Sequence, residues 1–311
     1  MHGARVGILG AAGAVGSATA FALALRGRAR LVLADAAAER LEAQRIDLEA
    51  LAAALPGLDV RAGDVDALAA CEAIVACAGA PHRDGAPRGA FLGENAAILA
   101  PLLDAIEAVE GAPPPALVLV SNPVDALTTL VARRLGGRAR VLGHTLNDTL
   151  RLRVAIARAR GCDPAQVEAW SVGEHGPHAV PLLSRVRVRG RRVELTSAEC
   201  AQVRAEVEGW YARWQALGTG RTTQWCSGWG VAAVVEALLD GDERPWPVST
   251  PLAGTWGVDD VCLTAPALLG PGRAPRVLRW AVAPDERAAI AGAARAVAGA
   301  CDALAATGAP R

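Results

Sequence analysis

Three polar side chains in the second half of the chain could carry out proton transfer and bind an acid. His175 lies between glycines in GEHG (173–176), and Asp148 and Arg151 are three residues apart in NDTLRLR (147–153). If a helix begins there, Asp148 and Arg151 share one of its faces. A histidine held by a carboxylate serves as a general acid and base, and an arginine binds a carboxylate through two parallel hydrogen bonds. Taken alone, a single histidine is more typical of a surface or hydrogen-bonded structural residue. The alternative for Asp148 and Arg151 is a surface ion pair.

Two further segments place polar groups where strands are predicted to end. CAGAPHRDGAPRG (77–89) follows an apolar run and carries the basic residues His82, Arg83 and Arg88 without an obvious structural partner. SNPVD (121–125) follows another apolar run. Open α/β sheets bind ligands at the carboxyl ends of their strands, so both segments are expected at one ligand-binding edge. The composition of 77–89 fits a disordered surface loop and a lid that closes over a substrate equally well.

A glycine-rich turn near the N-terminus predicts a dinucleotide site. Gly10, Gly13 and Gly16 in RVGILGAAGAVGS lie after a predicted strand and at the start of a predicted helix. Glycines let the backbone approach a pyrophosphate, which then binds at the helix N-terminus. Asp35 ends the next predicted strand, where a carboxylate binds ribose hydroxyls and repels a 2′-phosphate. The pattern favours NAD over NADP; a plain helix-starting turn is the alternative.

The surrounding elements predict an α/β fold that can position these groups. Continuous apolar runs alternate with helical segments through the first half, which indicates a Rossmann-type doubly wound parallel sheet. The second half contains alternating segments such as VRVRGRRVEL and long helices, so we expect an α+β substrate domain with antiparallel strands. We place an NAD-binding domain at 1–142 and a catalytic domain at 143–311. Strands are predicted at RVGILG, LVLAD, DVRAG, AIVACAG, ALVLVSN and RVLGH, and helices at 14–26, 37–54, 92–109, 124–135, 198–217, 228–240 and 284–306.

Composition excludes several classes of function. The 311 residues have a formal net charge of +0, which argues against a nucleic-acid or an acidic-membrane partner. All 32 Lys or Arg residues are Arg, so P-loop and Schiff-base lysines are excluded. The seven cysteines form no C-x-x-C pair, which indicates reduced buried thiols and no zinc site. Without a signal-like or uninterrupted apolar span, the chain is expected to be soluble and cytoplasmic.

Together and in this order, the motifs resemble those of the lactate/malate dehydrogenase family. The resemblance runs over nearly the whole chain and includes GAAGAVG, Asp35, RIDLEA, the loop ending at Arg88, SNPVD, the pair Asp148 and Arg151, GEHG and LAGTWGVDDVCLTAPALLG. It implies an NAD-dependent L-2-hydroxyacid dehydrogenase that interconverts a small 2-oxo acid and its 2-hydroxy acid. A non-catalytic NAD-binding sensor on the same fold is the alternative of a different class.

The resemblance also implies a role for each polar residue. His175 would exchange a proton with the C2 oxygen of the substrate, while Asp148 fixes and stabilises its imidazolium. Arg151 would bind the substrate carboxylate, Arg88 would polarise the ketone oxygen, and Asn122 would help to orient the same region. Gly79 and Asn122, at the ends of their strands, are also expected to contact the cofactor.

The identity of the acid depends on the loop. In the family, an Arg six residues before the polarising Arg selects a second carboxylate, as in malate dehydrogenases, whereas a Gln accepts the methyl of pyruvate. This chain has His82 at that position with Arg83 beside it, and Thr223 resembles the lactate-type residue across the pocket. We expect oxaloacetate slightly ahead of pyruvate, with an unusual 2-oxo acid as a further alternative.

The chain also departs from the family pattern near the site. Asn147 replaces the usual Leu before the catalytic Asp, Pro177 and His178 follow GEHG, and His144 is a further histidine without a family role. Residues 44–55 form an amphipathic helix that matches a segment commonly found at a subunit interface, so a homodimer or homotetramer is expected. The alternative for this segment is a helix that covers its own sheet.

Overall fold

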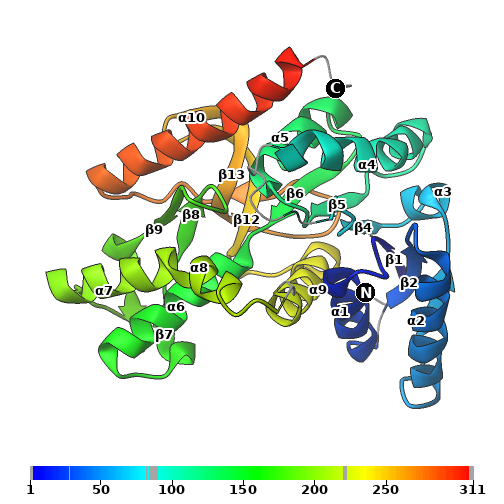
Figure 1. The fold of residues 1–311 in the computed structure, drawn as a ribbon, viewed down its shortest axis with the longest axis horizontal. Coiled ribbons are helices and arrows are strands. Elements are labelled where there is room, and N and C mark those ends of the chain that lie inside the picture. The colour runs from blue at the N-terminus through cyan, green and yellow to red at the C-terminus, as the bar shows by residue number, and fades with distance from the viewer. Residues whose placement is uncertain (1–2, 28, 82, 84–89, 220–222, 308–311) are drawn as a thin grey trace.

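The computed structural model describes residues 3–27, 29–81, 83, 90–219 and 223–307. Figure 1 shows a large twisted sheet with helices on both faces and a second group of helices at one end. The main strands are β1 Ala4–Leu9, β2 Ala29–Ala34, β3 Asp59–Ala62, β4 Ala73–Ala76, β5 Ala116–Leu119, β6 Arg140–His144, β8 Ser171–Gly173, β9 Ala179–Pro181, β12 Trp246–Thr255 and β13 Val258–Leu268. The helices are α1 Ala14–Leu25, α2 Ala38–Ala50, α3 Val65–Ala69, α4 Ala90–Ala108, α5 Val124–Leu135, α6 Leu146–Arg160, α7 Ser197–Glu208, α8 Trp210–Gln215, α9 Gln224–Asp240 and α10 Pro284–Ala306.

The first six strands form the predicted parallel sheet, in the order β3-β2-β1-β4-β5-β6. Every residue of β4 and β5 is buried, as expected for strands that are covered on both faces. The doubly wound α/β fold predicted from the sequence is therefore confirmed. Because the strands are parallel, their carboxyl ends bring the turns after β1, β4 and β5 to one edge.

The second half of the chain extends the same sheet. Strand β12 pairs antiparallel with β6, and β13, β8 and β9 follow. The antiparallel character of this half is as predicted, although the long β12–β13 hairpin was not anticipated. The proposed boundary after residue 142 falls inside β6, so the sheet runs through it without interruption. The division into two domains at this point stays a prediction.

Apolar side chains form three cores around this sheet. One core lies between the sheet and helices α3, α4, α5 and α10, and a second between the opposite face and α1, α2 and α9. A third, smaller core joins α6 and α7 to a small sheet of β7 Val167–Glu168, β10 Arg187–Val188 and β11 Arg191–Arg192. The third core packs α6, which carries Asp148 and Arg151, against α7 and this small sheet.

The helix predicted over 198–217 is two helices, α7 and α8, which meet at Gly209. Helix α10 is long and apolar enough to cross a membrane by length and composition alone. In the structure, however, Ile290, Ala293 and Val297 on one of its faces are buried in the core beneath it. That face is accounted for by packing within the chain.

Candidate active site

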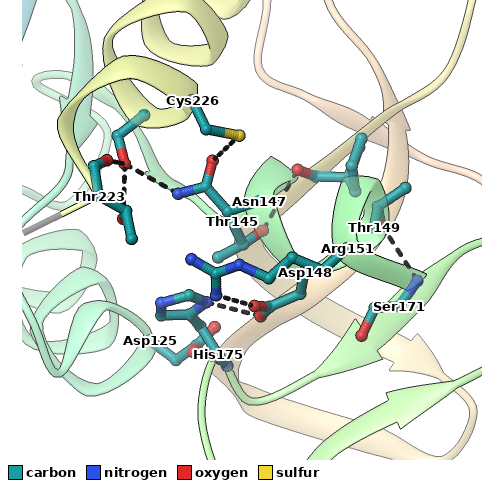
Figure 2. A network of polar contacts seen from close by, with 12 residues as sticks. Asp125, Thr145, Asn147, Asp148, Thr149, Arg151, Ser171, His175, Thr223 and Cys226 are labelled. Carbon is teal, nitrogen blue, oxygen red and sulfur yellow. Dashed lines mark hydrogen bonds and ion pairs between the residues drawn. The ribbon is translucent and has the colours of Figure 1, made fainter. Parts of the chain in front are cut away.

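His175 and Asp148 form the centre of the site. His175 follows β8, and Asp148 lies in the first turn of α6. Their side chains meet with 2.6 Å between His175 Nδ1 and Asp148 Oδ2 (Figure 2). Gly173 permits the turn that delivers His175, because its φ is +84° and a Cβ there would lie 2.9 Å from the main-chain oxygen of His178. With Nδ1 engaged, Nε2 is the ring nitrogen left for a substrate.

A second carboxylate, which the sequence did not reveal, also holds His175. Asp125 lies in the first turn of α5, is 1% exposed, and accepts the main-chain N–H of His175 at 2.6 Å. Burial lowers the pKa of His175, but the charge and hydrogen bond of Asp148 together with the charge of Asp125 outweigh it and raise the pKa overall. The two carboxylates thus favour the protonated imidazole, the form that can donate a proton.

Arg151 lies one turn after Asp148 on the same face of α6, as predicted. Its Nη1 donates to Asp148 Oδ1 at 3.3 Å, and its guanidinium carbon lies 3.7 Å from the ring centroid of Trp210. The side chains of Arg151, Asp148 and His175 are 20%, 14% and 17% exposed. An imidazole, a carboxylate and a guanidinium, all largely shielded from solvent, therefore lie together.

A polar cluster joins α6 to the first turn of α9. Asn147 donates from Nδ2 to Ser227 Oγ at 2.8 Å, and its Oδ1 accepts from Cys226 Sγ at 3.2 Å (Figure 2). Thr223 is the N-cap residue of α9, and its carbonyl accepts the Ser227 hydroxyl. The Asn that replaces the expected Leu thus has polar partners on α9, and Thr223 belongs to the same network.

His144 is buried at the end of β6, and neither ring nitrogen makes a hydrogen bond of normal geometry within the described part of the chain, although the Asn147 side chain favours its protonated form. A Cβ at Gly230 of α9 would lie 2.7 Å from His144 Cε1, so the glycine makes room for the ring. Burial, reinforced by the charge of His175, lowers the pKa of His144 to about 4. His144 is therefore neutral near pH 7. The other additional histidine, His178, is exposed.

The glycine-rich turn has the geometry of a dinucleotide cradle. Gly10 has φ +81°, and a Cβ there would lie 2.4 Å from the main-chain nitrogen of Ala78. A Cβ at Gly16 would lie 2.1 Å from Gly10 oxygen, and Gly13 is the N-cap residue of α1. Asp35, after β2, accepts main-chain N–H groups of residues 12 and 37 at 2.9 Å each. These contacts fix its carboxylate beside the turn and leave lone pairs for ribose hydroxyls, so the residues present fit NAD.

Asn95 of α4 connects the turns after β4 and β5, which the sequence also did not reveal. Its Nδ2 donates to Asn122 oxygen at 2.6 Å, and its Oδ1 accepts from Ala80 nitrogen at 2.7 Å. A Cβ at Gly79 would lie 3.3 Å from Asn95 Oδ1 and 3.4 Å from Ser121 Oγ. The Asn95 amide therefore links the turn that contains Gly79 to the turn that contains Asn122.

Of the basic loop residues, only Arg83 belongs to the part that the structure describes. Its guanidinium pairs with Glu94 Oε1 at 2.5 Å and lies 5.1 Å from the ring centroid of Phe91. The predicted residues His82 and Arg88 lie outside the described residues. Arg83 is thus engaged with α4.

No metal centre is found within the described ranges, since no three His, Cys, Asp or Glu side chains gather there. All seven cysteines are described and are free thiols. Burial raises the pKa of Cys77 and of Cys262 to about 12 each, which keeps both thiols protonated.

The sequence is similar to proteins of known function over most of its length. Residues 4–143 match the model of the NAD binding domain of lactate/malate dehydrogenases. The chain is 34% identical to the L-lactate dehydrogenase of Nitratidesulfovibrio vulgaris over 302 residues, which are 94% of this chain and 96% of that protein. It is 31% identical to the L-lactate dehydrogenase of Treponema denticola over 94% of this chain and 95% of that one.

Solved structures agree. A minor L-lactate dehydrogenase from Enterococcus mundtii superposes with a TM-score of 0.86 at 26% identity, covering 97% of this chain and 98% of that one. Malate dehydrogenase from Cryptosporidium parvum superposes with a TM-score of 0.89 at 20% identity, covering 98% and 100%. The second likeness is informative about the fold alone.

Proposed function

This chain belongs to the lactate/malate dehydrogenase family, and we propose that it reversibly reduces a small 2-oxo acid to the L-2-hydroxy acid. It is an NAD-dependent oxidoreductase that acts on a CH–OH group. A sensor that binds NAD without catalysis is set aside. The observation that carries the proposal is the convergence of His175, Asp148 and Arg151, because a proton donor, its counter-charge and an acid-binding cation then lie together.

When bound, NADH supplies the hydride that reduces C2 of the acid. The dinucleotide would be held by Gly10, Gly13, Gly16 and Asp35. Gly79 and Asn122 would contact it farther along the same edge of the sheet. In the reducing direction, protonated His175 donates its Nε2 proton to the C2 oxygen, which becomes the hydroxyl. In the oxidising direction, neutral His175 accepts that proton.

The other polar residues position the acid and stabilise charge. Arg151 binds the C1 carboxylate, because a guanidinium offers paired N–H donors in one plane. Asp148 fixes the His175 ring and stabilises its positive charge, and Asp125 anchors its backbone. Arg88 and Asn122 complete the proposal, with Arg88 polarising the C2 carbonyl when the loop covers the site.

Within this class, pyruvate is the leading substrate and oxaloacetate the second. Arg83 could have supplied a charge for a second carboxylate, but it pairs with Glu94 and stacks on Phe91. The names of the two relatives described above, both L-lactate dehydrogenases, are a second argument for pyruvate. The sequence alone favoured oxaloacetate slightly, and on these two considerations we propose pyruvate first. Oxaloacetate stays a candidate because His82 stands at the loop position that reads the tail in the family, and a histidine could hydrogen-bond a second carboxylate.

The kcat/KM for pyruvate and for oxaloacetate tests this order in the wild type, His82→Arg and His82→Gln. If His82 reads the tail, Arg shifts preference towards oxaloacetate and Gln towards pyruvate, each by at least about tenfold, or about 1.4 kcal/mol. If both variants keep the wild-type preference, a residue other than His82 recognises the tail of the substrate, and Thr223 is the next candidate. Wild-type preference for oxaloacetate would restore the original order.

We further propose a cytoplasmic enzyme that is at least a dimer. Apolar side chains of α1 (Phe21 and Leu25), α2 (Ile46) and α9 (Trp225 and Trp229) are 45% to 72% exposed. Side chains such as these are candidates for a surface that a second copy of the chain covers. Light scattering at micromolar protein checks the assembly, and a monomeric mass would contradict it.

A further inference from the structure

Helix α8 contacts the candidate active site through one aromatic ring. The guanidinium carbon of Arg151 lies 3.7 Å from the ring centroid of Trp210, the first residue of α8. At this distance the cation lies directly against the face of the indole. The residue that would bind the substrate carboxylate is thus in contact with a helix outside the core of the site.

Two tryptophans form the inner face of α8. None of its residues is buried, and Tyr211 on its outer side is 46% exposed. Trp210 and Trp214, one turn apart, are its only half-buried residues. Their rings are stacked, with centroids 5.4 Å apart and an interplanar angle of 12°. The stacked pair forms the inner face of α8, and Trp214 supports the ring that touches Arg151.

The contact limits how Arg151 can meet an anion. A guanidinium binds a carboxylate through N–H groups that point outwards in its plane. Trp210 covers one face of that plane, and Asp148 Oδ1 accepts from Nη1 at 3.3 Å. The remaining N–H edge is therefore held in a fixed orientation. A flexible arginine would have to lose side-chain entropy to adopt the same orientation when the acid binds.

We propose that Trp210, supported by Trp214, is a positioning residue for substrate binding: it orients the Arg151 guanidinium so that its free N–H edge donates to the C1 carboxylate of a 2-oxo acid. The inference deepens the proposed function and rests on it for the class of ligand. Trp210 itself takes no part in proton transfer, so its removal acts on the affinity for the acid and leaves the affinity for NADH unchanged.

The test compares Trp210→Leu, which removes the aromatic face, with Trp210→Phe, which keeps a smaller one. Tyr211→Leu is the matched control, because it removes an aromatic ring from the exposed side of the same helix. The probe is oxamate, a planar 2-oxo carboxylate whose amide resists reduction, titrated by calorimetry into each protein with saturating NADH. NADH affinity and the KM and kcat for pyruvate are measured alongside.

We expect Trp210→Leu to weaken oxamate binding and to raise KM about tenfold, with kcat changed less and NADH affinity within about twofold. Trp210→Phe should recover most of the loss, and Tyr211→Leu should match the wild type. Oxamate affinity unchanged in Trp210→Leu would overturn the proposal. So would a parallel loss of NADH affinity, since Trp210 would then support the fold as a whole.

The outcomes also separate this inference from the proposed function. If wild-type turnover is normal and Trp210→Leu is unaffected, the inference is wrong and the function stands. If no 2-oxo acid is turned over, but oxamate binds and its affinity falls in Trp210→Leu, the function is wrong and the inference stands. If the wild type neither binds oxamate nor turns over a 2-oxo acid, both are wrong.

Discussion

The main-chain N–H of His175 donates a 2.6 Å hydrogen bond to Asp125 Oδ2, at the start of a different helix from the one that carries Asp148. The imidazole is therefore held at its backbone by one carboxylate and at Nδ1 by another. Burial raises the pKa of Asp125 to about 6, while hydrogen bonds and the charge of His175 work against the rise. A second group near the site thus titrates close to neutral pH.

Asp125→Asn should shift the pH dependence of catalysis. The amide oxygen can still accept the His175 N–H, but the negative charge that helps to raise the His175 pKa is lost. Reduction needs the protonated imidazole, so kcat/KM for the oxo acid falls as pH rises through this pKa. In the variant that fall should begin at lower pH. Identical pH profiles for the wild type and Asp125→Asn would show that the charge of Asp125 does not affect the pKa of His175.

The same variant changes how stability depends on pH. The folded-state pKa of Asp125 is raised from 3.8 to about 6, so the folded protein holds this proton more tightly than the unfolded chain. Its contribution is complete below about pH 4 and is lost as pH rises through 6, by about 3 kcal/mol at most. Asp125→Asn should lack this loss. Denaturant unfolding of both proteins across that range measures the difference.

Cofactor choice should follow Asp35. The main-chain N–H groups of residues 12 and 37 fix its carboxylate beside the glycine-rich turn, where it would repel a 2′-phosphate. The wild type is expected to prefer NADH. Asp35→Ser combined with Ala36→Arg should raise kcat/KM for NADPH by at least about tenfold, since one repulsion is removed and a phosphate partner is added. A wild type that already prefers NADPH would contradict the ribose assignment.

His144→Leu should stabilise the ligand-free protein. The imidazole is buried, neither of its nitrogens makes a hydrogen bond of normal geometry among the described residues, and such a group costs about 1–3 kcal/mol. Its folded-state pKa is lowered to about 4, so the unfolded chain binds a proton first as pH falls below 6.5. The wild type therefore loses stability through His144 as pH falls from 6.5 to about 4, and the variant should lack this loss. Unfolding midpoints at neutral pH test the expected gain in stability, and midpoints at acidic pH test the smaller loss. His144→Gln is the polar control.

Much of the fold could be predicted because its signals are local. The apolar runs of β4 and β5 and the helix at 124–135 follow from neighbouring residues, and the structure has them where they were predicted. The β12–β13 hairpin was missed because Pro247, Pro251 and Pro266 interrupt it and its pairing with β6 is remote in sequence. The break between α7 and α8 at Gly209 was also missed.

The site was predictable only in part, because only its local sequence motifs could be recognised. His175, Asp148 and Arg151 stand in short motifs, so they could be proposed as a set before their distances were known. Asp125 and Trp210 contact that set across long separations in sequence, through the packing of α5 and α8. Asp125 ends the SNPVD segment, but nothing in that segment indicates a contact with His175, and no local pattern marks Trp210. The roles of all these side chains stay predictions until they are measured.

The most direct test of the central claim is the rate of NADH oxidation with pyruvate and with oxaloacetate in the wild type and in His175→Ala, with NADH affinity measured in both. The account predicts turnover of at least one acid by the wild type. In the variant, turnover should fall by about a hundredfold to ten-thousandfold while NADH affinity stays within about twofold, because only the proton donor is lost. Wild-type turnover in His175→Ala, or no turnover of any 2-oxo acid by a wild type that binds NADH tightly, would contradict the account.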